Sequence, residues 1–536
     1  MRVKNKTEWH DRIDGRRISE EASAFWRLSA FLFYIFIKKT EKRGNMAGSM
    51  LLLPVFVPIA AGIAMLNITK MKERKVRDWY VGIVLLFSLL CAAFFAVRGM
   101  NLEYRVQLGG FLFLLRQDGL ARIFVTLTSI GWIANGFFSF EYMSREENQV
   151  QFFAFYLMAD GLINGFSYAG SYGTMKLFYI LISVAVIPLI IHRQDEKSVQ
   201  AALYYAAFFL IGLIGLEIGG GYVSRFLTSK EFVAGGSLDT AAVAGHEGMF
   251  LFMAFLLIVS YSIKSCLFPF HGWTKIVTEA APVAASGAIS GVVTKTGVIA
   301  VIRIVASMIG ADILRDTWVQ YVWMVLAVLS IFIGAVLAYK TDALAERMAY
   351  STVGQVGCVL YGVSLMENRA ITGALVLLTA HTLASLVLFF TVGAIVYQTG
   401  YKRASELRGI GRQIPHMMFC FSLVSFVIMG IPPTLGFVGD WNVSLGALET
   451  SIPCLPEIGI VIFIFGELFA AGYQFNIILR GFFPGERYDY VHENVCKPSL
   501  FTRLPAYLLT AAVYVIGFYP VPLLQLIEQA LRGMAL

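Results

Sequence analysis

The 536-residue sequence has few charged residues and few cysteines. Asp, Glu, Lys and Arg together make up 15% of it. None of its six cysteines belongs to a C-x-x-C pair; they are Cys91, Cys266, Cys358, Cys420, Cys454 and Cys496. Because iron–sulfur clusters and structural zinc sites need closely spaced cysteines, the sequence encodes neither. It also contains no nucleotide, haem, flavin or metal motif. We therefore expect the chain to bind no cofactor and to leave any redox chemistry to a partner.

Apolar residues are abundant instead. They make up 57% of the sequence, and many of them form continuous runs of about twenty residues. A bilayer core of about 30 Å needs a helix of about that length. Only helices and closed barrels satisfy the backbone inside a membrane, and continuous apolar runs exclude the barrel, whose strands alternate. The sequence therefore predicts an all-α polytopic membrane protein.

The net charge of +8 comes from 43 Lys and Arg against 35 Asp and Glu. In a soluble protein this excess would suggest nucleic acid, but here the basic residues lie mostly in the loops between apolar runs. The positive-inside rule explains that distribution, so we expect no nucleic acid. The basic loops after Thr69 and Ile191, and those that begin at Tyr401 and Leu479, are predicted to be cytoplasmic. A basic-looped protein of this kind fits the plasma membrane of a prokaryote.

The apolar runs predict about fourteen transmembrane helices. They lie near residues 50–66, 79–98, 118–139, 150–169, 174–192, 200–221, 247–270, 281–308, 317–338, 347–365, 370–397, 414–438, 457–479 and 504–526. Residues 1–45 form a polar extension with about fifteen apolar residues from Ala24 onward, too few for a span. We expect an interfacial helix there, unless the native protein begins at Met46 or Met50.

Two of the predicted helices are interrupted, at 268–272 (FPFHG) and at 430–434 (GIPPT). Interruptions at matching places in two halves of a transporter are typical of inverted repeats, and unwound backbone at membrane depth lines a cavity. We therefore expect two five-helix units, 150–309 and 316–482. Three helices at 46–140 precede them, and a loop and last helix at 483–536 follow. Proline kinks without function also occur in membrane helices, so symmetry remains a hypothesis.

Five polar residues lie deep in apolar sequence: Lys264, Lys295, His381, Asp440 and Glu217. A charge at the centre of a membrane helix costs about 2.5–3.5 kcal/mol on insertion scales, so such residues face water or one another. Two lysines, a histidine that titrates near neutrality and a carboxylate can pass protons through intervening water.

Each of these residues also has a structural alternative. Lys264 could reach the interface beside Trp273, and Lys295 could form a static ion pair. His381 could be a packing residue, and Asp440 could cap the helix that restarts near Trp441. Glu217 could lie at the outer water interface. Arg303, toward the end of its span, is interpreted as an interface anchor.

The stretch FPFHGWTKIVTEAAPVAASGAISGVVTKTGVIAVIR resembles the core signature of a known family. Three further stretches support the resemblance: RQDGLARIF, RMAYSTVGQVGCVLYG, and the block from LTAHTLASLVLFFTVGAI through GIPPTLGFVGDW. The family comprises the antiporter-like subunits of respiratory complex I, Mrp-type sodium/proton antiporters and energy-converting membrane hydrogenases. The resemblance covers roughly residues 50–518.

The resemblance implies fourteen transmembrane helices with two inverted five-helix repeats and broken helices seven and twelve. It also implies a central proton relay. By resemblance, Lys264 is the lysine of helix seven, Lys295 the lysine of helix eight and His381 the histidine of helix eleven. Asp440 takes the terminal position of helix twelve, where the family usually has glutamate or lysine.

Two positions depart from the family pattern. Members usually carry a glutamate on helix five that pairs with the helix-seven lysine, and alignment on Pro188 places Ser183 there. Many members also have a lysine four residues after the helix-eleven histidine, where this chain has Ser385. Either another acid substitutes, with Asp160 and Glu217 as candidates, or the first half channel is inert.

The function that follows is an ion-translocating membrane subunit of a multisubunit redox-driven complex. The ion is H⁺, with Na⁺ coupling left open. The expected partners are other membrane subunits and a peripheral module that contains iron–sulfur clusters. Two alternatives remain: a subunit of an Mrp-type cation/proton antiporter, and a non-conducting scaffold for a redox module. Ser183 and Ser385 favour the scaffold, whereas the deep titratable residues disfavour it.

Overall fold

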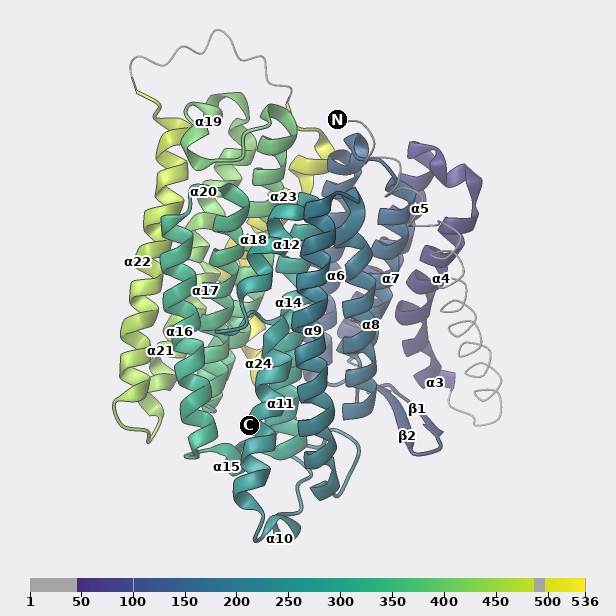
Figure 1. Ribbon diagram of the computed structural model, residues 1–536, viewed down its shortest axis with the longest axis vertical. Helices are drawn as coiled ribbons and strands as arrows, with labels where there is room; N and C mark the ends of the chain where they lie inside the picture. The colour runs from purple at the N-terminus through teal and green to yellow at the C-terminus, as the bar shows by residue number, and fades with distance from the viewer. Residues whose placement is uncertain (1–45, 100, 486–496, 536) are drawn as a thin grey trace, which may run out of the picture.

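The protein, a computed structural model, is described over residues 46–99, 101–485 and 497–535. The helix predicted within residues 1–45 lies outside these ranges. Long helices stand side by side with their axes roughly parallel to the long axis of the molecule (Figure 1). This arrangement is that of a polytopic helical membrane protein.

The helices follow the predicted runs closely, with short connections. The first part contains α3 (Met46–Ser49), α4 (Leu53–Asn67), α5 (Arg74–Arg98) and α6 (Gly119–Tyr142). The middle contains α7 (Gln149–Ser167), α8 (Tyr172–Ile190), α9 (Glu196–Val223), α10 (Thr240–Val243), α11 (Glu247–Lys264), α12 (Gly272–Ala280), α13 (Val283–Ala288), α14 (Thr294–Arg303) and α15 (Ala311–Leu314). The last part contains α16 (Trp318–Lys340), α17 (Leu344–Ser364), α18 (Asn368–Thr399), α19 (Ile410–Gln413), α20 (Pro415–Ile428), α21 (Leu435–Glu449), α22 (Leu455–Phe482), α23 (Leu500–Phe518) and α24 (Val521–Arg532).

Within the described residues, 11 helices are long and apolar enough to cross a membrane. The predicted runs near 150–169 and 347–365 form α7 and α17, which are not among these 11. The run near 414–438 is divided between α20 and α21. The membrane class of the fold therefore agrees with the prediction, whereas the 11 helices do not by themselves establish fourteen crossings.

Both predicted interruptions are present. The first separates α11 from α12, and its unwound backbone is partly satisfied by a neighbouring helix, because Ser330 Oγ of α16 accepts a hydrogen bond from the Phe268 N–H at 2.8 Å. The second separates α20 from α21 at Met429 to Thr434, where Pro432 and Pro433 have no N–H to continue a helix. Gly430 adopts a φ of +60° there, a conformation that favours glycine.

Three local features were not predicted. Two strands, β1 (Glu103–Leu108) and β2 (Phe111–Arg116), form an antiparallel hairpin between α5 and α6. The helix predicted near 281–308 contains two π-helical segments, Ile289–Val293 and Ile304–Ile309. The run predicted as one helix near 504–526 is divided at Pro520 into α23 and α24. Proline interrupts the helix because it removes a backbone donor and crowds the preceding turn.

The interior of the bundle is formed by two segments that carry candidate relay residues. The most apolar stretches of Val283–Ile309 and of α18 are 100% buried inside the protein, against 33% for α5 and 28% for α22. α5 and α22 therefore form part of the outer surface. A charged side chain on either inner segment is separated from lipid by other helices, which is where functional charges in membrane proteins lie.

Candidate functional site

Lys264, the last residue of α11, is 4% exposed. Its Nζ donates a hydrogen bond to the Tyr179 backbone oxygen of α8 at 3.0 Å, and it lies 3.5 Å from the centre of the Tyr179 ring. The Phe209 ring of α9 is 5.9 Å away. Trp273, in contrast, uses its Nε1 to donate to the Ile263 backbone oxygen. The lysine is therefore held inside the bundle and does not extend to an interface.

No carboxylate of the described residues pairs with Lys264. Ser183, at the position of the usual family acid, donates its hydroxyl to the same Tyr179 oxygen at 2.8 Å. Asp160 on α7 is buried and accepts a hydrogen bond from Ser88 of α5 at 2.6 Å. Glu217 on α9 is 54% exposed and pairs with Lys176 at 2.9 Å. The structure thus does not bring either candidate substitute acid into contact with Lys264.

Lys295 on α14 is 1% exposed and follows a π-helical segment directly. Its Nζ donates to the Ser290 backbone oxygen within that segment and lies 3.4 Å from Thr294 Oγ1. It has no carboxylate partner among the described residues. Single π-helical turns occur frequently at functional sites because they displace backbone groups from the regular helical ladder. The static ion pair that the sequence left open for Lys295 is not observed.

The two lysine-bearing segments are joined at their lysines. Ser265, next to Lys264, donates its hydroxyl to the Thr294 backbone oxygen, next to Lys295, at 2.9 Å. A side chain at Gly297 would clash with Ser265 Oγ, so the small residue permits this close approach. The interruption after α11 therefore places the two lysines on adjoining backbone segments.

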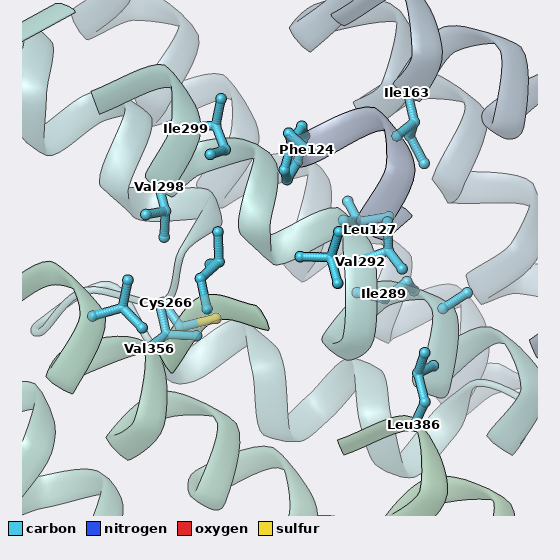
Figure 2. Packing of buried hydrophobic residues seen from close by; sticks show 14 of the residues in the cluster. Phe124, Leu127, Ile163, Cys266, Ile289, Val292, Val298, Ile299, Val356 and Leu386 are labelled. Atoms are coloured by element: carbon cyan, nitrogen blue, oxygen red, sulfur yellow. The ribbon is translucent and has the colours of Figure 1, made fainter. Parts of the chain in front are cut away.

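His381 on α18 is 3% exposed, and its Nδ1 has no hydrogen-bond partner among the described residues. It is close enough to Lys295 for their charges to interact. The surroundings are otherwise apolar. Figure 2 shows the packed side chains of this region, including Val292, Val298, Ile299, Cys266, Val356 and Leu386. An unpartnered imidazole nitrogen in such an interior is available to accept or donate a proton.

Asp440 lies within α21, after the second interruption. The helix is capped by Thr434, whose side chain accepts from the Phe437 N–H, so Asp440 is not the cap. α21 packs closely against α18, since a side chain at Gly439 would lie 2.6 Å from Leu377, one turn before His381. Ser385, the second departure from the family pattern, donates to the Thr382 backbone oxygen on its own helix.

A second carboxyl group lies beside Asp440. A side chain at Gly430 would clash with Asp440 Oδ2 and lie 3.9 Å from Glu467 Oε2 of α22, and the two acids interact electrostatically. Glu467 Oε1 accepts from Gln355 Nε2 at 3.2 Å, while its Oε2 has no partner among the described residues. Sequence reasoning missed Glu467. Its central place in IVIFIFGELFAAG is the signal that identified Lys295 and His381, and it applied here equally.

Arg303 is a structural residue and not the interface anchor that the sequence suggested. It is 1% exposed, and its two terminal nitrogens donate to the Asp118 carboxylate at 2.8 and 3.1 Å. Asp118 also caps α6 by accepting from the Ala121 N–H. This bidentate pair joins the end of α14 to the start of α6. Buried arginine is stable in such an arrangement because the carboxylate matches both nitrogens.

Comparison with known proteins gives one family. A model described as "NADH:quinone oxidoreductase/Mrp antiporter, TM" matches residues 169–466. NADH-quinone oxidoreductase subunit N of Desulforudis audaxviator is 28% identical over 63% of this chain and 66% of its own length. One of the subunits of the Na⁺/H⁺ antiporter of Alkalihalophilus pseudofirmus is 23% identical over 89% and 95%. F420H2 dehydrogenase subunit N of Methanosarcina mazei is 23% identical over 90% and 98%.

Solved structures share the fold. A chain of the Mrp complex from Dietzia sp. DQ12-45-1b superposes with a TM-score of 0.79 at 20% identity, over 91% of this chain and 98% of that chain. A chain of respiratory complex I from Thermus thermophilus has a TM-score of 0.75 at 18% identity, over 90% and 99%. These proteins are parts of multisubunit membrane complexes, so the arrangement of helices found here is one that works beside other membrane subunits.

Proposed function

Because the matching family model spans more than half of it, the chain belongs to the NADH:quinone oxidoreductase/Mrp antiporter membrane family, and we propose that it is a proton-translocating subunit of a redox-driven complex. The path of the proton runs through Lys264, Lys295, His381 and then Asp440 with Glu467. A change of charge in an adjoining subunit would alter the proton occupancy of Lys264, and the proton would pass along the series.

The observation that carries this proposal is the environment of Lys295. The side chain is almost fully buried on an entirely interior segment, and its hydrogen-bond partners are a backbone oxygen and a hydroxyl. A lysine whose only role were structural would be expected beside a carboxylate, because an unpaired buried charge is costly. A lysine without a fixed counter-ion is free to exchange its proton with a neighbour such as His381.

The finer architecture belongs to the same proposal. We expect fourteen crossings and two inverted five-helix units, 150–309 and 316–482, each with one interrupted helix. The basic loops would face the cytoplasm of a prokaryotic cell. α19, within the basic loop that begins at Tyr401, lies at the opposite end of the molecule from α10 and α15, as this orientation requires (Figure 1).

The redox partner is proposed from the printed names of two relatives, subunits of an NADH-quinone oxidoreductase and of an F420H2 dehydrogenase. A peripheral module with iron–sulfur clusters would supply the driving force. A second candidate is a subunit of an Mrp-type antiporter driven by ion gradients, with Na⁺ as the exchanged ion. It is favoured by the match to almost the full length of the Na⁺/H⁺ antiporter relative and by the Mrp structure.

The test uses the complex purified from its own host through a tag on this chain and reconstituted into liposomes. Mass spectrometry identifies the co-purifying subunits, and a pH-sensitive dye reports proton uptake driven by an electron donor or by a Na⁺ gradient. Lys295→Ala should lower proton uptake by roughly a hundredfold, because the transfer step loses its proton carrier.

Lys340→Ala is the matched control, since Lys340 is exposed at the end of α16 and should leave uptake unchanged. Full uptake in the Lys295→Ala complex would overturn the relay and favour the non-conducting scaffold. Uptake driven only by Na⁺, without redox subunits, would replace the redox-driven complex with the antiporter.

A further inference from the structure

The two contacts that hold Lys264 both come from one residue. Tyr179 offers its backbone oxygen at 3.0 Å and the face of its ring at 3.5 Å from Nζ. The ring itself is fixed, because it is 2% exposed and packs edge-on against Tyr261 with ring centres 4.9 Å apart. Aromatic faces attract cations through their quadrupole, most strongly where water is excluded. A neutral ring therefore occupies the place beside the ammonium where an acid would be expected.

The neighbouring Ser183 shows where such an acid would stand. Ser183 Oγ and Lys264 Nζ donate to the same Tyr179 oxygen, so both side chains converge on a single atom of α8. Ser183 is fully buried one helical turn after Tyr179. A carboxylate at position 183 would consequently reach Lys264. Its absence leaves the lysine with a partner whose charge cannot change.

The space around this pair is small and almost free of ionisable groups. A cavity of about 10 Å³, room for roughly one water molecule, is lined by Tyr179, Tyr205, Phe208, Phe209, Lys264 and Trp273. The titratable groups near Lys264 are Tyr205 from α9, Tyr261 from α11 and Cys266 from the interruption. No carboxylate in the described part of the chain contacts Nζ.

We propose that Tyr179 is the positioning residue of Lys264, and that its ring and backbone oxygen replace the acid that α8 lacks. This inference rests on the proposed function and adds to it the way in which the first relay group is held. The ring stabilises the ammonium without forming an ion pair, so a change of charge on α8 is not needed for Lys264 to gain or lose a proton. The adjacent cavity supplies the place for the exchanging water.

The experiment compares Tyr179→Leu with Tyr179→Phe in the reconstituted complex. Tyr179→Leu removes the ring face and should lower proton uptake about tenfold and move the pH midpoint of uptake to lower pH, because the ammonium loses its partner. Tyr179→Phe keeps both the ring and the backbone oxygen and should retain uptake within twofold and the original midpoint. Phe178→Leu is the control for loss of an aromatic ring, since Phe178 is equally buried on α8 and packs against Phe113, away from Lys264.

Ser183→Glu gives an opposite shift. A carboxylate there should pair with Lys264, retain its proton and move the midpoint to higher pH with slower uptake. The proposal is overturned if Tyr179→Leu matches Phe178→Leu in rate and midpoint, or if Tyr179→Phe fails as Tyr179→Leu does. Lys295→Ala in the same preparation separates the two levels: its loss of uptake with an unaffected Tyr179→Leu rejects the role of Tyr179 alone, whereas uptake that survives Lys295→Ala rejects the relay itself.

Discussion

The two interrupted helices place opposite charges in similar settings. The first interruption begins directly after Lys264, a cation whose partners are a ring and a backbone oxygen. The second is followed by Asp440, which lies beside Glu467 with no cation paired to either acid among the described residues. An ordinary structural arrangement would pair the cation with an acid. Here the described bundle keeps them apart, with Lys295 and His381 in the segments between.

This difference indicates a direction in the chemistry, from a basic end to an acidic end. Two carboxyl groups in one low-dielectric site do not both ionise easily, so such a pair tends to share a proton. A pair that shares a proton can accept one and release another, as the end of a relay must. The first interruption holds a single base instead. We therefore expect substitutions at the two ends to act differently.

Removing the acid at the second interruption should have the largest effect. Asp440→Asn keeps the size of the side chain but cannot exchange a proton, so uptake should fall by roughly a hundredfold. Asp440→Glu should restore a substantial part of it. Dye-monitored uptake in liposomes measures both. Unchanged uptake in Asp440→Asn would show that the path ends elsewhere and would remove the contrast between the two interruptions.

Glu467 should have a smaller effect that depends on Asp440. Glu467→Gln leaves Asp440 without its partner acid and should lower uptake about tenfold. In the double variant with Asp440→Asn, uptake should be no lower than in Asp440→Asn alone, because groups that act as a unit are not additive. Multiplicative losses in the double variant would mean that the two acids act independently.

Glu217 and Asp160 should matter least for transport. Glu217 is exposed and paired with Lys176, and exposed pairs contribute about 0.2–1 kcal/mol to stability. Glu217→Gln should therefore change neither uptake nor thermal stability by a measurable amount. Asp160→Asn should keep uptake within twofold, with stability followed separately because Asp160 is buried against Ser88. A tenfold loss of uptake in either variant would reinstate it as the substitute acid of the first interruption.

Several features of the site were predictable from neighbouring residues alone. Pro269 and Pro433 interrupt helices wherever they are placed, because proline lacks a backbone donor. Lys295 and His381 stand out because charge is costly in a long apolar run. The resemblance then assigned them to a relay, and Ser183 marked the missing acid. Glu467 carries the same signal as Lys295, so it was predictable even though the sequence reasoning passed over it.

Other features required the packed structure. The hairpin β1–β2 joins two helices and carries no apolar run of helical length, so hydropathy alone gave no sign of it. Arg303 looked like an interface anchor until its bidentate pair with Asp118 was visible, and these residues are far apart in sequence. Tyr179 is one of many tyrosines in apolar runs. Nothing in its local sequence distinguishes a ring that packs in the interior from one that faces a lysine.

The sequence by itself determined that this chain crosses a membrane many times, where two of its helices break, and which ionisable groups lie deep within them. These properties depend on the length of apolar runs and on backbone donors, which neighbouring residues decide. Only the tertiary structure decided the partners of those groups: Tyr179 for Lys264, Glu467 for Asp440 and Asp118 for Arg303. Each partner comes from a different helix, and helix packing, which depends on side-chain fit across the whole bundle, determines which helices meet.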